Sequence, residues 1–136
     1  IINNTIWDNA NEADITVWHG AQAFIQNNIL GDIDCDEESQ AHMHFNDIVN
    51  RPAEGDNIQA DPLFVDPNAG DFHLLSQTGR WDPIGGIRIE DYTTSPCIDA
   101  GDPTSAVGHE PTPNGGRINL GAYGGTAEAS YSIAFR

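Results

Sequence analysis

Three seven-residue segments in the first fifty residues share one pattern, an asparagine followed two positions later by an isoleucine. The segments are residues 1–7, 24–30 and 43–49, and they align without gaps. The shared asparagines recur about every twenty residues, which is the length of one unit in proteins built from stacked repeats. The repeat therefore predicts coils of chain that stack on one another, with equivalent residues lying in columns.

Each column has a physical role in such a stack. Stacked asparagines bond their side-chain amides to one another and tolerate the left-handed backbone of a sharp bend. Stacked isoleucines are β-branched and fill the interior between strands. We therefore predict an all-β chain, with these columns running through its coils: Asn4, Asn27 and Asn46 in one, and Ile6, Ile29 and Ile48 in the other.

The rest of the chain also favours strands and loops. Residues 15–19 alternate between apolar and other residues, which is typical of a strand. Proline and glycine are concentrated after residue 50, where we expect loops and short strands. Residues 77–93 read as a surface excursion, with a hairpin bend at Gly85-Gly86. Helix signals are almost absent.

Three sequence blocks follow the repeats in a fixed order. They are residues 60–74, which include Asp61-Pro62 and Asp66-Pro67, then residues 94–103, which contain Ser95-Pro96-Cys97, and then residues 119–125. As a set, they resemble the C-terminal region of secreted right-handed parallel β-helix proteins of the choice-of-anchor Q type, with PbH1-like repeats. The resemblance implies a right-handed parallel β-helix (β-solenoid) whose C-terminal coils end in a loop-rich capping module. On this basis we assign coils to 1–50, terminal coils and the cap to 51–125, and a linker or tail to 126–136.

The charge excludes some partners. The net charge is −16, from 21 acidic and 5 basic residues, and all the basic residues are arginines. Such a surface repels phosphate backbones and anionic membranes, so we expect no nucleic-acid binding. No apolar run reaches membrane-spanning length, so we expect no membrane insertion. The chain begins without Met inside a repeat, so we expect a piece of a longer or processed protein. The lack of a signal peptide in this sequence therefore does not argue against export.

An acidic surface suits calcium, which prefers six to eight oxygen ligands. The 32–38 loop starts like an EF-hand, but Glu37 replaces the turn glycine and Met43 stands where the bidentate glutamate belongs. The alternative is a solvated acidic loop, and Asp-Pro pairs that cap turns. The candidate calcium ligands are Asp32, Asp34, Asp36, Asp61, Asp66 and Asp71.

Three further sites remain open at this level. Cys35 and Cys97 permit one disulfide, or are two separate thiols. Trp81 beside Arg80 is a candidate for stacking on a sugar ring. His42 and His44 share one side of a strand and would need a third ligand to hold a transition metal, so stacked histidines are the alternative.

These observations predict a structural or adhesive β-helix segment of a bacterial surface protein, with calcium tightening its loops. The expected location is extracellular or at the cell surface, as the resemblance implies. Its expected partners are upstream coils or another copy stacked head-to-tail, and cell-surface polysaccharide. The alternative is the terminal part of a carbohydrate-active β-helix enzyme, a polysaccharide lyase or glycoside hydrolase, or a glycan-binding module. No catalytic pair stands out in the sequence, so a non-enzymatic role is favoured.

Overall fold

The computed structural model describes residues 1–9 and 12–133 of the chain. It is almost entirely β-structure and loop, and its described residues contain no helix beyond a single 3-10 turn, η1 (Pro67–Ala69). The all-β prediction is therefore confirmed. No helix in the described part is long and apolar enough to cross a membrane.

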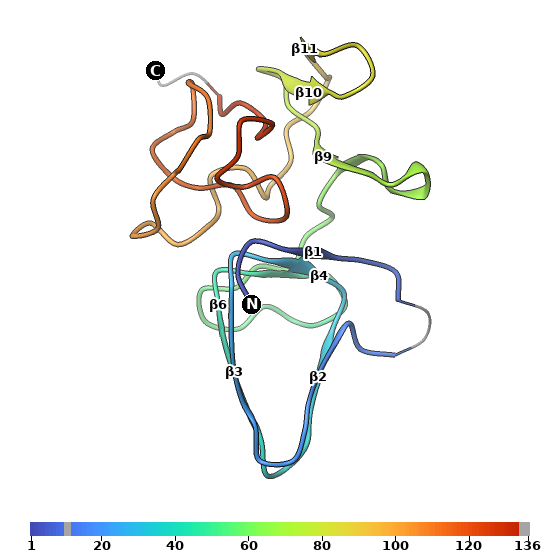
Figure 1. Cartoon of the computed structure of the whole chain (residues 1–136), viewed down its shortest axis with the longest axis vertical. Helices are drawn as coiled ribbons and strands as arrows, with labels where there is room; N and C mark the ends of the chain where they lie inside the picture. The colour runs from blue at the N-terminus through green and yellow to red at the C-terminus, as the bar shows by residue number, and fades with distance from the viewer. Residues whose placement is uncertain (10–11, 134–136) are drawn as a thin grey trace.

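Residues 1–9 and 12–58 form stacked turns of chain whose strands pair in parallel. β1 (Thr5–Ile6), β4 (Ile29–Leu30) and β7 (Asp47–Ile48) form a three-stranded sheet. β2 (Ile15–Val17) pairs with β5 (Ile33–Cys35), and β3 (Gln22–Gln26) pairs with β6 (Gln40–His44). Strands far apart in sequence thus lie side by side, one turn above the next, as Figure 1 shows for β3 and β6.

The interior of the stack is apolar because alternate strand residues point inward. It holds one cluster of buried aliphatic side chains: Ile15, Val17, Ile25, Leu30, Ile33 and Ile48. The partly buried Ile6, Ala23, Ala41 and Met43 pack against this cluster.

The predicted columns exist, but the middle turn is shifted by one residue. The asparagine ladder contains Asn28, and not Asn27, and it extends to Asn57. The strand register pairs Ile6 with Leu30 and Leu30 with Ile48, so Leu30 is the interior residue. Ile29 instead points outward, and Asn27 lies at the bend with a left-handed backbone (φ 58°).

The remaining strands belong to a C-terminal module. β8 (Phe64–Asp66) pairs antiparallel with β9 (Asp71–Leu74). β10 (Arg80–Asp82) and β11 (Ile87–Ile89) form the predicted hairpin. The three sequence blocks meet in one buried cluster, to which each contributes apolar side chains: Phe64, Leu74, Cys97 and Leu120, together with Ile29 of the coils.

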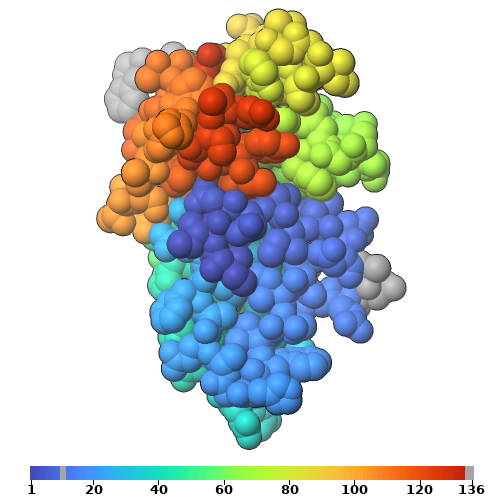
Figure 2. All heavy atoms as spheres, viewed as in Figure 1, coloured from blue at the N-terminus to red at the C-terminus, as the bar shows by residue number. Residues whose placement is uncertain are grey.

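The module packs along the side of the stack instead of lying across its end. Its contacts reach the β1–β4–β7 sheet and the bend before β4: Ala122 N donates to Thr5 Oγ1, and Gly121 N donates to Asn27 O. Figure 1 shows the module next to β1 and β4, and Figure 2 shows the C-terminal segments in direct contact with the N-terminal ones. Residues 129–132, predicted as a linker or tail, are packed into this module, where Ser130 Oγ donates to Leu74 O.

Candidate functional site

A groove runs over the outer face of the β2–β5 sheet and the loop that precedes β2. Strand alternation places Thr16 and Trp18 outward, with Thr16 beside Asp34 in the strand register. Trp18 is 52% exposed. This end of the groove is a hollow of about 420 Å³. Its lining includes Glu12, Thr16, Trp18, Asp32, Asp34 and Arg51.

Arg51 is held in place at the edge of this hollow. Its Nε lies 3.1 Å from Asp32 Oδ1, and its guanidinium also donates to Ile33 O at 2.6 Å. Asp32 Oδ1 in turn accepts from Ile33 N. The groove thus presents a fixed cation beside carboxylates and an exposed aromatic ring.

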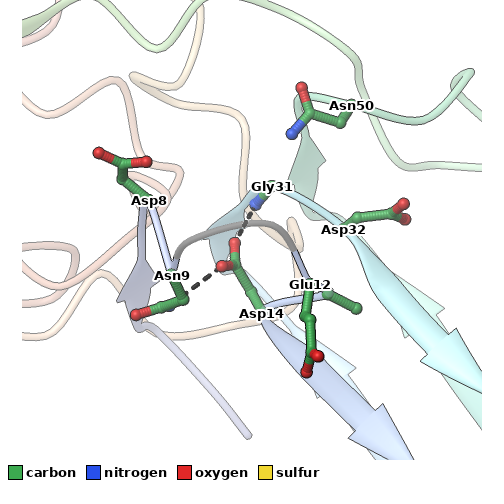
Figure 3. A pocket seen from close by; sticks show the side chains of 8 residues that line it. Asp8, Asn9, Glu12, Asp14, Gly31, Asp32 and Asn50 are labelled. Carbon is green, nitrogen blue, oxygen red and sulfur yellow. Dashed lines mark hydrogen bonds between the residues drawn. The ribbon is translucent and has the colours of Figure 1, made fainter.

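The groove continues into a second hollow of about 340 Å³ that shares Glu12 and Asp32 with the first. Its centre is Asp14, which accepts from Gly31 N at 2.5 Å and from Asn9 Nδ2 at 3.0 Å (Figure 3). Position 31 has to be glycine for this contact, because a Cβ there would lie 2.8 Å from Asp14 Oδ2. Asp14 therefore fastens the loop before β2 to the next turn of the stack.

The carboxylates around Asp14 do not converge. In Figure 3, Asp8, Glu12 and Asp32 point in different directions from the centre of the hollow. Across residues 1–9 and 12–133, no three histidine, cysteine, aspartate or glutamate side chains lie together as a metal site.

The predicted calcium ligands are accordingly dispersed, and most of them stabilise local turns. Asp36 accepts from His19 N, and Asp61 accepts from Leu63 N. Asp66 caps η1 by accepting from Ala69 N. Asp71 contacts His73, Asp32 contacts Arg51, and Asp34 lines the groove. Asp32 and Asp34 line one hollow, and Asp66 and Asp71 line another cavity, but no three of the six carboxylates lie together in the described residues, and calcium binding by them stays a prediction.

The predicted disulfide is wrong. Cys35 is a free, exposed residue on β5, whereas Cys97 is a free, buried residue of the C-terminal module. The Cys97 thiol donates to Asp47 Oδ2 at 3.1 Å. Burial raises the pKa of this thiol far above its usual range, and the Asp47 carboxylate raises it further, so Cys97 stays protonated and unreactive.

The predicted glycan pair is split between two faces of the hairpin. Adjacent residues of a strand point to opposite sides. Trp81 lies under the guanidinium of Arg88, whereas Arg80 faces the other way and pairs with Asp91 at 3.1 Å. The two residues therefore cannot bind one sugar ring together.

The two strand histidines do not share a third ligand. The ring of His42 stacks on Phe24, with centroids 4.7 Å apart, and His44 Nδ1 lies 3.1 Å from Asp56 Oδ2. Sequence reasoning missed the groove because it chose Trp81, and not Trp18, as the tryptophan that could stack on a sugar ring. The alternation of residues 15–18 already carried the signal, since it places Trp18 on the same face as Thr16.

Residues 1–101 match a protein family described as "Disaggregatase related". The match names neither the choice-of-anchor Q type nor the PbH1 repeat that the sequence blocks resemble. No curated protein and no solved structure matches the chain. The matched residues include the whole groove and the turns that carry it.

Proposed function

The chain belongs to the disaggregatase-related family, and on that premise we propose that it is a structural and adhesive segment of an extracellular protein that holds polysaccharide in the Trp18 groove. The proposed scaffold is the terminal part of a right-handed parallel β-helix. Its support is the parallel pairing of all the strands in residues 1–58, together with the right-handed rule for connections between parallel strands.

The observation that carries the binding proposal is the exposed Trp18 ring beside groups that donate hydrogen bonds and groups that accept them. A sugar has an apolar face that suits an aromatic ring, and hydroxyls that both donate and accept. In the groove, Asp34 accepts, Arg51 donates, and Thr16 does both. The net charge of −16 repels polyanions, so the proposed ligand is a neutral polysaccharide.

The binding test uses tetrasaccharides of glucose and of N-acetylglucosamine in isothermal titration calorimetry. Trp18→Ala should weaken binding about tenfold, which corresponds to about 1.4 kcal/mol of lost stacking and burial. Tyr92→Ala is the matched control, because Tyr92 is a fully exposed aromatic residue outside the groove. Equal affinity of wild type and Trp18→Ala, or no binding of either sugar at millimolar concentration, would contradict the proposal.

A second candidate function is polysaccharide hydrolysis by the same groove. It is favoured by the carboxylates that line the groove. Hydrolysis requires an acid and a second carboxylate on either side of the scissile bond. Glu12 and Asp34 are the carboxylates that line the Trp18 end without a part in the Arg51 ion pair. Release of reducing ends that Glu12→Gln or Asp34→Asn abolishes would favour this function over adhesion.

The proposed assembly partner is a further turn of β-structure, supplied by another copy of the chain. Within the described residues, β1 and β2 pair on one side only, and Ile2 is 62% exposed. Unpaired strand edges favour the addition of strands, and a head-to-tail contact without closure gives filaments. Light scattering over a concentration series should show wild-type growth that Ile2→Lys suppresses. A monomer at all concentrations would exclude this partner.

A further inference from the structure

A second cavity, of about 500 Å³, lies in the C-terminal module between the β8–η1–β9 segment and the β10–β11 hairpin. Its volume is in the range of small-molecule sites. The two walls are the segments drawn in green and yellow beside β9 and β10 in Figure 1. The cavity belongs to the module, whereas the Trp18 groove belongs to the stacked turns, and the two share no residue.

The hairpin wall is fixed from behind. Arg88 lies between the rings of Trp81 and Tyr131, at 5.5 and 4.4 Å from their centroids. Its guanidinium also donates to the carbonyls of Ala127 and Ala129. Strand alternation then directs Arg80 and Asp82 to the opposite face, where both line the cavity.

Two polar side chains of the cavity, Arg80 and His73, are held in place by neighbouring side chains. Arg80 Nε donates to Asp91 Oδ1 at 3.1 Å, and the Arg80 side chain is only 13% exposed. On the other wall, His73 is almost completely buried, with Asp71 at Nδ1 and Glu128 at Nε2. The imidazole of His73 stacks on Tyr123 at 3.7 Å. Such preorganised side chains lose little conformational entropy when a ligand binds.

The chemistry of the lining disfavours an anionic ligand. Asp66, Asp71 and Asp82 repel an anion, and the lining arginine, Arg80, is already paired with Asp91. Aspartates accept hydrogen bonds and arginine only donates them, so the ligand needs groups that do both. Val65, Ile84 and Ile89 add an apolar wall.

We propose that this cavity is a second carbohydrate site, which binds one unit of a neutral polysaccharide. Its hydroxyls accept from Arg80 and donate to Asp82, and its apolar face lies on Ile84 and Ile89. Together with the Trp18 groove, and resting on the function proposed for it, the cavity makes the chain bivalent. A bivalent chain gains avidity and crosslinks two polysaccharide strands.

The test compares three proteins in calorimetric titrations with the glucose and N-acetylglucosamine tetrasaccharides. Ala69→Phe fills the cavity from the exposed turn η1 without removing a hydrogen-bonding side chain. Ala53→Phe, on an exposed loop outside the cavity, is the matched control. We expect two sites in wild type and in Ala53→Phe, and one site in Ala69→Phe. In Trp18→Ala we expect the cavity site unchanged and the groove site about tenfold weaker. Wild type should also make a neutral polysaccharide solution turbid, and neither Ala69→Phe nor Trp18→Ala should do so.

The outcomes separate the two proposals. If wild type shows one site, and Trp18→Ala weakens it while Ala69→Phe does not, the cavity proposal is overturned and the groove proposal stands. If wild type shows one site, and only Ala69→Phe removes it, the function proposed for the groove is overturned and the cavity proposal stands. Tighter binding of a galacturonate tetrasaccharide than of either neutral one overturns the assignment of a neutral ligand, and no binding of any tetrasaccharide overturns both sites.

Discussion

Replacing Asn46 with alanine should strongly destabilise the stacked turns. Asn46 is completely buried. Its Nδ2 donates to Ile25 O, His44 O and Asn57 Oδ1, at 2.8 to 3.1 Å. Its Oδ1 accepts from the backbone and the side-chain amide of Asn28, both at 3.0 Å. The variant therefore leaves several polar groups of two adjacent turns without partners.

A buried group left without its partner costs about 1–3 kcal/mol, and part of that cost is relieved when water enters or the structure relaxes. We therefore expect Asn46→Ala to lose about 3–5 kcal/mol of unfolding free energy, a large fraction of the 5–15 kcal/mol typical of a domain. Urea denaturation followed by circular dichroism measures the loss as a lower midpoint.

The matched control for this measurement is Asn68→Ala, in the exposed turn η1. It should change the unfolding free energy by less than about 0.5 kcal/mol. A loss below about 1 kcal/mol for Asn46→Ala would refute the reasoning, because it would mean that the ladder does not hold the turns together.

Three further predictions concern the core, the acid dependence of stability and the thiols. Leu30→Ala should cost about 2–5 kcal/mol in urea denaturation because it opens a void inside the stack, whereas a loss below about 1 kcal/mol would favour Ile29 as the interior residue. Burial raises the pKa of the Glu110 carboxyl in the folded protein. Protonated Glu110 therefore stabilises the fold fully below the unfolded pKa of about 4.3, and this stabilisation is lost as pH rises through the higher folded pKa. The variant Glu110→Gln keeps an oxygen that accepts from Asn119 N and Gly125 N, and it should lose less stability than wild type between pH 4 and 7. Equal slopes of unfolding free energy against pH for the two proteins would contradict the assignment of this pH dependence to Glu110. A thiol reagent should label Cys35 at once in the native protein and Cys97 only after unfolding; simultaneous labelling of both would show that the module does not bury Cys97.

The repeat predicted the stacked turns, but not their register. The first and third segments were aligned correctly, since Asn4 and Asn46 both belong to the ladder. The middle segment carries two adjacent asparagines, and a gapless alignment took Asn27 where the structure uses Asn28. Because side chains alternate along a strand, this slip of one residue exchanged an interior position for an outward one. The strand pairing of Leu30 and the contacts of Ile29 with the C-terminal module show which choice is correct.

The sites were harder to predict than the strands. The three sequence blocks correctly indicated one packed module, because each supplies apolar residues to its core. Adjacency in sequence, however, suggested that Arg80 and Trp81 act together, and strand alternation separates them. Likewise, spacing alone could not show that Cys35 and Cys97 lie in different parts of the molecule. Contacts between distant segments decided each of these cases.

Chemical-shift mapping with an unlabelled neutral tetrasaccharide tests the account most directly. Our account predicts two separate sets of shifted signals. One contains the Trp18 indole and Thr16, and the other contains Tyr123 and Ile84, which line the hairpin cavity. Signals that do not move at millimolar sugar, or that move only around Phe24 and His42 on the β3–β6 face, would contradict it.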